Sequence, residues 1–190
     1  MSTLFNMIPS PPLTAEHYKF LNNTGEAGDL IQNFNWSQTS IGSIEEWSPA
    51  LKVTVSNILR SAFPMFLFWG DEFLCFYNDA FRPSLGSDGK HPAIGKKAIV
   101  VWGEIWDIIG PLLQKVFVTG EAVMFEDRLV PFYRNGKVED IYWTFTYSPA
   151  MGEDDKICGV LVTCMETTKH VLARNFFLSP NLPEPSPSTL

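Results

Sequence analysis

Apolar residues recur along this chain with two different periods, and the first clear pattern is helical. Leu51, Val55 and Ile58 lie three or four positions apart and would share one face of a helix. Ser48 is suited to cap the first turn, and Pro49 to occupy its first position, where the missing N–H costs nothing. The pattern therefore predicts a helix that begins after Ser48.

Two short apolar runs follow, at residues 65–69 and 73–77, and a Gly-Asp-Glu turn joins them. Runs of this length, rich in aromatic residues and separated by a turn sequence, predict a β-hairpin. A longer helical pattern covers residues 102–118. Pro111 should kink this helix, and Gly120 is placed to end it.

Three more strand patterns lie at residues 123–133, 138–148 and 157–166, and a short helical pattern follows at 168–177. The first two of these strands are joined through Asn135-Gly136, the strongest short signal for a hairpin turn. The whole order predicts an α+β fold, in which a five-stranded antiparallel sheet has helices inserted after its second strand. The helix after Ser48 would cap this sheet from the N-terminal side.

The same patterns divide the chain into segments around one folded domain. Residues 1–24 and 179–190 contain many prolines and little to bury, so we expect a flexible N-terminal tail and a Pro/Ser-rich C-terminal tail. Residues 25–62 form an extension that ends in the capping helix. Residues 63–168 form the sheet domain, and residues 169–178 a short last helix.

Composition favours a folded chain and excludes some partners. Apolar residues make up 45% of the 190 residues and aromatic residues 14%, as is typical of a globular domain. The 14 basic and 21 acidic residues give a net charge of −7, so we expect neither nucleic acid nor an anionic membrane surface as a partner. No apolar stretch reaches the roughly 20 residues that cross a bilayer, and no signal peptide is recognisable. We therefore expect a cytoplasmic protein.

Residues that could carry chemistry are few and scattered. Cys75, Cys158 and Cys164 lie in apolar runs and lack the spacing of a disulfide framework or a zinc site. No two of the three histidines have the spacing of metal ligands. The acidic run 153–155 lacks the pattern of a calcium-binding loop and is interpreted as a solvated turn. No nucleophile motif is present, so we expect neither a catalytic residue nor a metal site.

Several short motifs resemble one known family when they are taken in order. Tyr77-Asn78-Asp79-Ala80-Phe81 follows the second strand pattern, and Ile157-Cys158-Gly159-Val160 begins the last one. Glu166-Thr167-Thr168 stands where the last strand ends. Together these motifs resemble the PAS domain, or sensory box, found at the N-terminus of bacterial two-component sensor histidine kinases.

The resemblance implies a ligand pocket on the concave side of the sheet. Alternation along the first strand puts Met65, Leu67 and Trp69 on one face and Phe66 and Phe68 on the other. By resemblance, the set with Met65 faces the concave side. The implied pocket lining is then Met65, Leu67, Trp69, Leu74, Phe76, Phe81, Trp143, Phe145, Tyr147, Val160, Val162 and Cys164. A closely packed core gives the same sequence pattern as a cavity, so both interpretations stand at this point.

The opposite face of the sheet should be apolar as well. Its expected members are Phe66, Phe68, Phe73, Cys75, Tyr77, Tyr142, Leu161 and Met165. A sheet that is apolar on both faces must be covered on both. The helix after Ser48 can cover part of this face and a second copy of the chain the rest, so we expect a homodimer.

The resemblance also implies what the domain does. We expect a module without catalysis of its own, which regulates a histidine kinase, a response regulator or another output partner through a conformational change induced by a ligand or partner. Glu166, Thr167 and Thr168 would form the exit through which this change leaves the last strand. Two alternatives are a ligand-free dimerisation scaffold and a small α+β enzyme. The enzyme would need ionisable groups that converge in the cavity.

No particular cofactor is implied. A haem-binding PAS domain would need a histidine on the helix at 102–118, which contains none. Flavin photochemistry would need a cysteine where the resemblance places Ala98. A small apolar or aromatic molecule is the ligand class compatible with the expected lining, and the sequence does not identify it.

Overall fold

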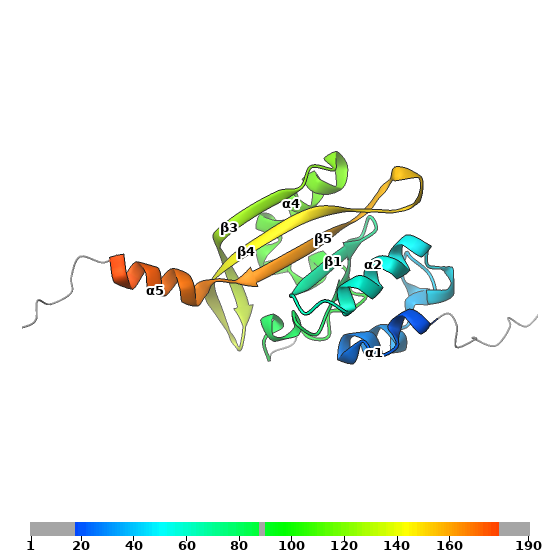
Figure 1. Cartoon of the computed structure of the whole chain (residues 1–190), viewed down its shortest axis with the longest axis horizontal. Coiled ribbons are helices and arrows are strands. Elements are labelled where there is room, and N and C mark those ends of the chain that lie inside the picture. Colours follow the sequence, from blue (N-terminus) through cyan, green and yellow to red (C-terminus); the bar gives the residue numbers. More distant parts are fainter. Residues whose placement is uncertain (1–17, 88–89, 179–190) are drawn as a thin grey trace, which may run out of the picture.

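A five-stranded antiparallel sheet forms the centre of the computed structural model, which describes residues 18–87 and 90–178. The strands are β1 (Met65–Trp69), β2 (Leu74–Tyr77), β3 (Val123–Arg134), β4 (Lys137–Met151) and β5 (Ile157–Glu166). They lie in the order β2-β1-β5-β4-β3, so the first and last strands of the chain pair with each other at the centre (Figure 1).

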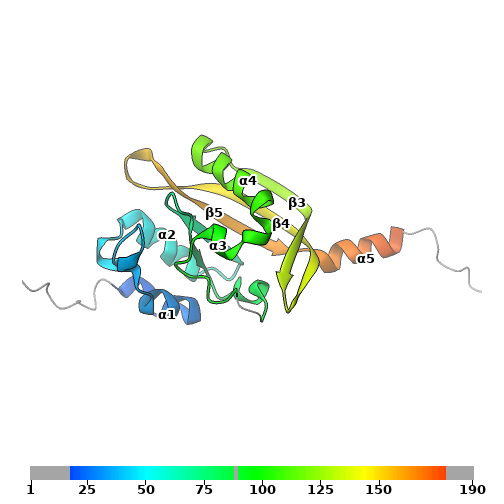
Figure 2. The same ribbon diagram turned by 180° about the vertical axis from the view of Figure 1, so that it is seen from behind.

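Helices lie on both sides of this sheet, and the last one extends away from it (Figure 1). The helices are α1 (Gly25–Asn33), α2 (Pro49–Leu59), α3 (Ala98–Val101), α4 (Trp106–Thr119) and α5 (Thr168–Leu178). α3 and α4 are inserted between β2 and β3 and lie behind the sheet in Figure 1, whereas α2 lies in front of β1; Figure 2 shows the reverse side. The α+β fold class expected from the sequence is confirmed. None of the helices in the described part is long and apolar enough to span a membrane.

α2 forms for the reasons expected from its sequence. The Ser48 hydroxyl oxygen accepts a hydrogen bond from the Leu51 backbone N–H at 3.2 Å, and Pro49 occupies the first turn. The helix buries Leu51, Val55, Ile58 and Leu59, which are its predicted apolar face. This face packs against β1 and β2, so α2 covers one end of the sheet.

α4 begins later than its apolar pattern predicted. A 3-10 turn at Gly103–Ile105 precedes it, and the helix starts at Trp106 instead of residue 102. Pro111 lies inside the helix. Gly120 ends it in the left-handed conformation, with φ of 71°, which a residue without a Cβ adopts at little cost.

The hairpin turns follow their sequence signals, although the strands run further than expected. Asn135 and Gly136 both have positive φ, as a tight turn between β3 and β4 requires. β4 extends to Met151, three residues past the predicted end at 148. β5 occupies the predicted residues 157–166.

The N-terminal segment differs from the expected tail. Residues 18–24 pack on the domain: Leu21 is 4% exposed, and the Arg60 guanidinium donates to the backbone oxygens of Phe20 and Asn22. α1 follows at once and buries Ala27 and Ile31, although no helix was predicted there. The boundary at residue 24 is therefore corrected. Residues 1–17 and 179–190, where the tails were expected, lie outside the described residues.

Two neighbouring polar residues after β2 join these N-terminal elements, which we call the cap (residues 18–62), to the sheet. The Asn78 amide donates to the backbone oxygens of Ile58, Ser61 and Phe63, and its oxygen accepts from the Met65 N–H. The Asp79 carboxylate accepts from the first N–H groups of α1, those of Glu26 and Ala27, at 3.0 and 2.8 Å. The motif that follows β2 thus fixes the position of both cap helices.

Candidate functional site

The pairing of β1 with its neighbours decides which residues share each face of the sheet. Phe66 lies opposite both Tyr77 of β2 and Val162 of β5. Leu67 lies opposite Phe76 and Leu161. Directly opposed residues point to the same face. One face therefore carries Phe66 and Val162, and the other carries Leu67 and Phe76.

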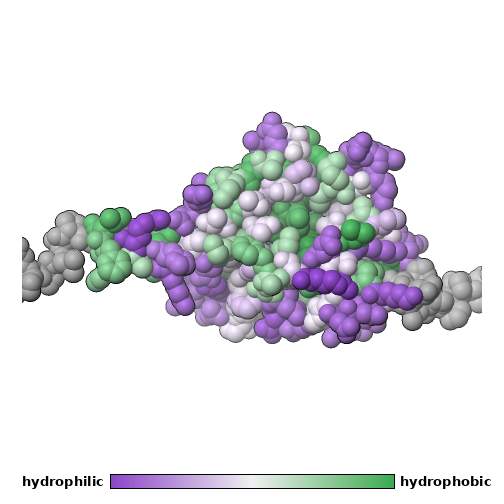
Figure 3. Space-filling view, in the orientation of Figure 1, coloured by the Kyte–Doolittle hydropathy of each residue, from purple (hydrophilic) through white to green (hydrophobic). Residues whose placement is uncertain are grey.

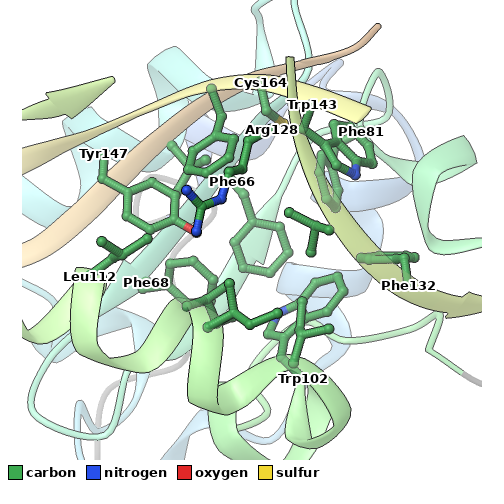
Figure 4. A pocket seen from close by; sticks show the side chains of 16 residues that line it. Phe66, Phe68, Phe81, Trp102, Leu112, Arg128, Phe132, Trp143, Tyr147 and Cys164 are labelled. Atoms are coloured by element: carbon green, nitrogen blue, oxygen red, sulfur yellow. The ribbon is translucent and has the colours of Figure 1, made fainter. Parts of the chain in front are cut away.

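A cavity of about 80 Å³ lies on the first of these faces, between the sheet and α4 (Figure 4). Aromatic and branched aliphatic side chains make up almost all of its wall. The lining residues are Phe66, Phe68, Phe81, Trp102, Ile105, Ile108, Ile109, Leu112, Arg128, Val130, Phe132, Trp143, Phe145, Tyr147, Val162 and Cys164. The aromatic rings come from β1, β3, β4 and the segments that flank α3.

Half of the residues expected at a pocket do lie at this cavity. They are Phe81, Trp143, Phe145, Tyr147, Val162 and Cys164. Val160 pairs with Phe68 and so shares their face, but it is not part of the lining. Whether any of these residues binds a ligand stays a prediction.

The expected placement is wrong for the residues of β1 and β2. Met65, Leu67, Trp69, Leu74 and Phe76 belong to the opposite face, and the cavity is lined by Phe66 and Phe68 instead. Cys75 and Tyr77, which pair with Phe68 and Phe66, lie on the cavity face too. The alternation along β1 was predicted correctly. Its phase relative to β4 and β5 was reversed, because a shift of one residue exchanges the two faces of a strand.

The opposite face of β2 packs against the aromatic residues of the cap. The ring of Phe76 stacks on Trp36, with 5.0 Å between centroids and 5° between planes. Trp47 meets both rings edge-on, at 4.8 Å from Trp36 and 5.6 Å from Phe76. The Trp36 indole N–H donates to the Ile31 backbone oxygen at 2.7 Å, so its polar atom is satisfied. These residues therefore form a packed core at this end of the sheet.

Sequence reasoning missed the part of the lining contributed by α4, its preceding turn and β3. The apolar stripe of α4 was recognised, but nothing in a single helix says which sheet face it covers. The sequence pattern does not predict Arg128 at a cavity, because a charged side chain in a strand usually faces solvent.

A β-bulge explains why Arg128 reaches the cavity. Phe125 pairs with Phe145, and Arg128 pairs with Trp143, so three steps along β3 match two along β4. Asp127 takes up the extra residue with φ of 46°, and its N–H donates to the Thr144 hydroxyl at 3.2 Å. Beyond the bulge the alternation is reversed, and Arg128, Val130 and Phe132 face the cavity.

Arg128 is the only side chain in this lining that carries a charge at neutral pH. Burial raises the pKa of the Tyr147 hydroxyl, and it raises the pKa of the Cys164 thiol to about 12, so both groups stay neutral. The Arg128 guanidinium lies 5.3 Å from the centre of the Phe125 ring, and the residue is exposed to solvent at the edge of the cavity. In Figure 4 its side chain extends toward the part of the cavity that holds Tyr147.

A lysine lies over the aromatic wall at the other end of the cavity. The Lys90 ammonium is 4.6 Å from the Trp102 ring centre and 4.5 Å from that of Phe132, and it forms an ion pair with Glu104. Burial lowers the pKa of Lys90 to about 8. This cation is therefore already matched by a carboxylate.

The expected exit residues are hydrogen-bonded to β3 and β4. Arg134 donates two hydrogen bonds to the Glu166 carboxylate, at 2.9 and 3.1 Å, and a third to Glu139 at 3.1 Å. The Thr167 N–H donates to the Tyr142 backbone oxygen at 2.7 Å. The end of β5 is thus fixed to the β3–β4 hairpin.

α5 has its own link to the β3 bulge. Asp127 forms an ion pair with Arg174 of α5 at 2.9 Å. The nearby Thr167 side chain and Arg174 both lower the pKa of the Asp127 carboxyl. Two consecutive residues of the bulge therefore contact different parts of the domain: Asp127 contacts α5, and Arg128 lines the cavity.

A second polar cluster lies outside this lining and joins the cap to β2. The Tyr77 hydroxyl is 2.8 Å from His91 Nδ1, and His91 Nε2 is 3.1 Å from the Glu26 carboxylate. Burial raises the pKa of Tyr77 to about 12, so its hydroxyl stays neutral. Within the described residues, no three His, Cys, Asp or Glu side chains are grouped to hold a metal ion.

Comparison with known proteins gives likenesses of structure alone. No protein-family model matches the chain, and no curated protein sequence does. A sensory box sensor histidine kinase from Vibrio cholerae is 16% identical, with a TM-score of 0.45 over 61% of this chain and 91% of that one. The PAS domain of a Colwellia psychrerythraea protein is 14% identical, with a TM-score of 0.46 over 63% and 98%.

A third similar structure is a dimer of Vibrio cholerae VqmA without its target DNA. It is 20% identical, with a TM-score of 0.44 over 56% of this chain and 48% of that one. Overlaps at these scores say nothing about ligand, partner or output. By its own strand order, with helices inserted between β2 and β3, the chain has the PAS-like fold that its motifs predicted.

Proposed function

We propose that this domain is a sensory module, in which occupation of the apolar cavity changes the position of α5. The observation that carries the proposal is the bulge in β3. It places Arg128 at the cavity and the preceding residue, Asp127, against α5. A change on one side of the bulge therefore has a short covalent path to the other.

The proposed mechanism is a shift between two packings. A molecule that enters the cavity contacts α4 on one side and Arg128 on the other. Movement of Arg128 displaces the bulge and weakens or realigns the ion pair between Asp127 and Arg174. The ligand can act in this way only if it binds one of the two packings more tightly than the other.

The output of this module belongs to the same proposal. α5 follows β5 directly, so a displaced β5 end reorients the helix that leaves the domain. Regulation of a histidine kinase, a response regulator or another partner would then occur through α5, and we propose no catalysis by the domain itself. The lining supports this proposal because its acid and base groups are few: one guanidinium, a neutral phenol and a neutral thiol.

Native mass spectrometry tests whether the cavity takes a ligand. The protein is purified from cells and weighed under native conditions and again after denaturation. We expect extra mass in the native sample that disappears on denaturation. A bare polypeptide mass in several preparations, with the protein still folded, would contradict the ligand-sensing proposal.

A second candidate function is a ligand-free dimerisation scaffold, and the outer face of β3, β4 and β5 favours it. Met124, Leu129 and Met165 are exposed on this face, and Tyr142 and Leu161 are half-buried. Figure 3 shows this side of the molecule, where weakly polar and apolar side chains cover the strands. A second copy that covers this face would make the homodimer expected from the sequence.

Light scattering at micromolar concentration tests the homodimer. We expect twice the chain mass for the native protein and the chain mass for Met165→Lys, since a lysine in the centre of the interface would be buried without a partner. Val53→Lys, on the exposed side of α2, is the matched control and should stay dimeric. A monomeric mass for the native protein would contradict both the dimer and the scaffold.

A further inference from the structure

The Arg128 guanidinium has no partner of opposite charge. Among the described residues, no carboxylate forms an ion pair with it, and its one recorded contact is the face of the Phe125 ring. The neighbouring acid, Asp127, is paired with Arg174 instead. Arginine presents its N–H donors in a planar fork that can bind a carboxylate through two parallel hydrogen bonds. This one is positioned to receive a group from outside the chain.

The backbone holds this side chain at the cavity. Without the bulge, alternation from Phe125 would turn Arg128 to the outer face of the sheet. The extra residue costs a ladder pairing and a positive φ at Asp127. The result of that distortion is a cation at the edge of an apolar cavity.

The other polar atoms of the lining are compatible with a ligand that carries a hydrogen-bond acceptor. The Tyr147 hydroxyl is neutral and can donate a hydrogen bond. No aspartate or glutamate lines the cavity, so nothing in it would repel a carboxylate or attract a cation. The other nearby cation, Lys90, is matched by Glu104.

The size of the cavity limits the apolar part of the ligand. Its 80 Å³ is about half of the roughly 150 Å³ cavity that admits benzene. A hydrocarbon tail of a few carbons is of the right order for this space. Because Arg128 is exposed, a charged head group bound to it can stay in contact with water while the tail is buried.

We propose that the cavity selects a small apolar carboxylate, which places its tail among the aromatic rings and its carboxylate on the Arg128 guanidinium. This inference rests on the proposed function, because it names the ligand class of the same cavity. It adds one requirement to the proposed function. The negative charge of the ligand must increase its affinity, and it must do so through Arg128.

A pair of probes with the same tail tests this requirement. Pentanoate and its neutral amide, pentanamide, are titrated into the protein, and binding is followed by NMR through the indole signals of Trp102 and Trp143, which line the cavity. We expect pentanoate to bind about tenfold or more tightly than pentanamide, because charge-assisted hydrogen bonds to an arginine exceed neutral ones. Trp36 and Trp47, in the packed cap, should not respond.

Substitution of Arg128 locates the effect. In Arg128→Gln the preference for pentanoate should fall to within about twofold, and Arg128→Lys should keep part of it. Lys137→Gln removes the same charge from an exposed position on the β3–β4 hairpin and should leave the preference unchanged. Urea unfolding of each variant shows that it is folded.

Each contrary outcome separates this inference from the proposed function. Equal binding of both probes, or an unchanged preference in Arg128→Gln, would overturn the carboxylate inference and leave a sensory cavity standing. Binding of neither probe would also overturn it. Native mass spectrometry would then decide the proposed function independently.

Discussion

The two faces of this sheet carry the same kinds of residue, but one face is a filled core and the other borders a cavity. On the cap side, Trp36, Trp47 and Phe76 stack and meet edge-on, and their rings are buried. On the side of α4, an equally aromatic wall borders a cavity of about 80 Å³. Aromatic content therefore does not distinguish a filled core from a cavity.

The difference lies in what covers each face. The cap brings two indoles, whose flat faces and edges fit the rings of β2, and it is tied down by Asn78 and Asp79. α4 brings branched aliphatic side chains that meet a strand distorted by a bulge. Atoms that border a void lack dispersion contacts on one side, so the second face is the less stabilising one. We infer that the cap face maintains the fold and that the cavity face is free to bind.

The largest expected effect is loss of an indole from the filled face. Trp36→Ala removes a fully buried ring that is stacked on Phe76 and hydrogen-bonded to Ile31. We expect the free energy of unfolding to fall by about 3–5 kcal/mol, measured by urea denaturation. A loss below about 1 kcal/mol would show that the cap is not a packed core.

Asn78 should rank next, because it joins the cap to the sheet. Asn78→Ala removes the amide that donates to the backbone oxygens of Ile58, Ser61 and Phe63, at a residue that is 1% exposed. We expect a loss of roughly 2–4 kcal/mol in the free energy of unfolding. Asn35→Ala, at an exposed asparagine of the cap, is the control and should cost much less. Similar losses of unfolding free energy in the two variants would show that Asn78 does not anchor the cap.

Enlarging a buried side chain should separate the two faces most clearly. Ala27→Val enlarges a side chain that is 1% exposed in the filled cap, and we expect it to cost about 1–3 kcal/mol. Val162→Ile adds one carbon beside the cavity and should change stability by less than about 1 kcal/mol. Both are read from thermal or urea unfolding. Equal costs would mean that the cavity is not available to new atoms.

A smaller effect is expected from the lysine beside the cavity. Burial lowers the pKa of Lys90 to about 8, from 10.5 in the unfolded chain. Between these pH values the unfolded chain binds the proton and the folded one does not, so this lysine makes stability rise as pH increases from 8 to 10.5. Comparing urea unfolding of the native protein with Lys90→Met across this window isolates the slope. An identical pH dependence of the two proteins would contradict it.

Much of this fold could be predicted from local chemistry. Ser48 and Pro49 mark the start of α2, Gly120 marks the end of α4, and Asn135-Gly136 marks a hairpin, because each signal acts within a few residues of itself. The order of strands and inserted helices followed from these signals.

The cavity could be predicted only in part, because its faces depend on pairing between distant strands. Alternation groups Phe66 with Phe68 and Leu67 with Trp69, but the pairing with β5 decides which group meets Val162. No glycine marks the bulge at Asp127 in the sequence, so the sequence could not assign Arg128 to the cavity face. α1 was missed because its short apolar pattern is stabilised by Asp79, more than 50 positions along the chain.

Xenon binding observed by NMR tests the central claim, that the cavity face is open and coupled to α5 while the cap face is filled. Xenon enters dry apolar cavities without requiring any polar contact. We predict shifts of the indole signals of Trp102 and Trp143 and of the Thr167 and Thr168 amides at the start of α5, with those of Trp36 and Trp47 unchanged. Shifts confined to the two cap tryptophans, or shifts at the cavity without any at Thr167 and Thr168, would contradict the account.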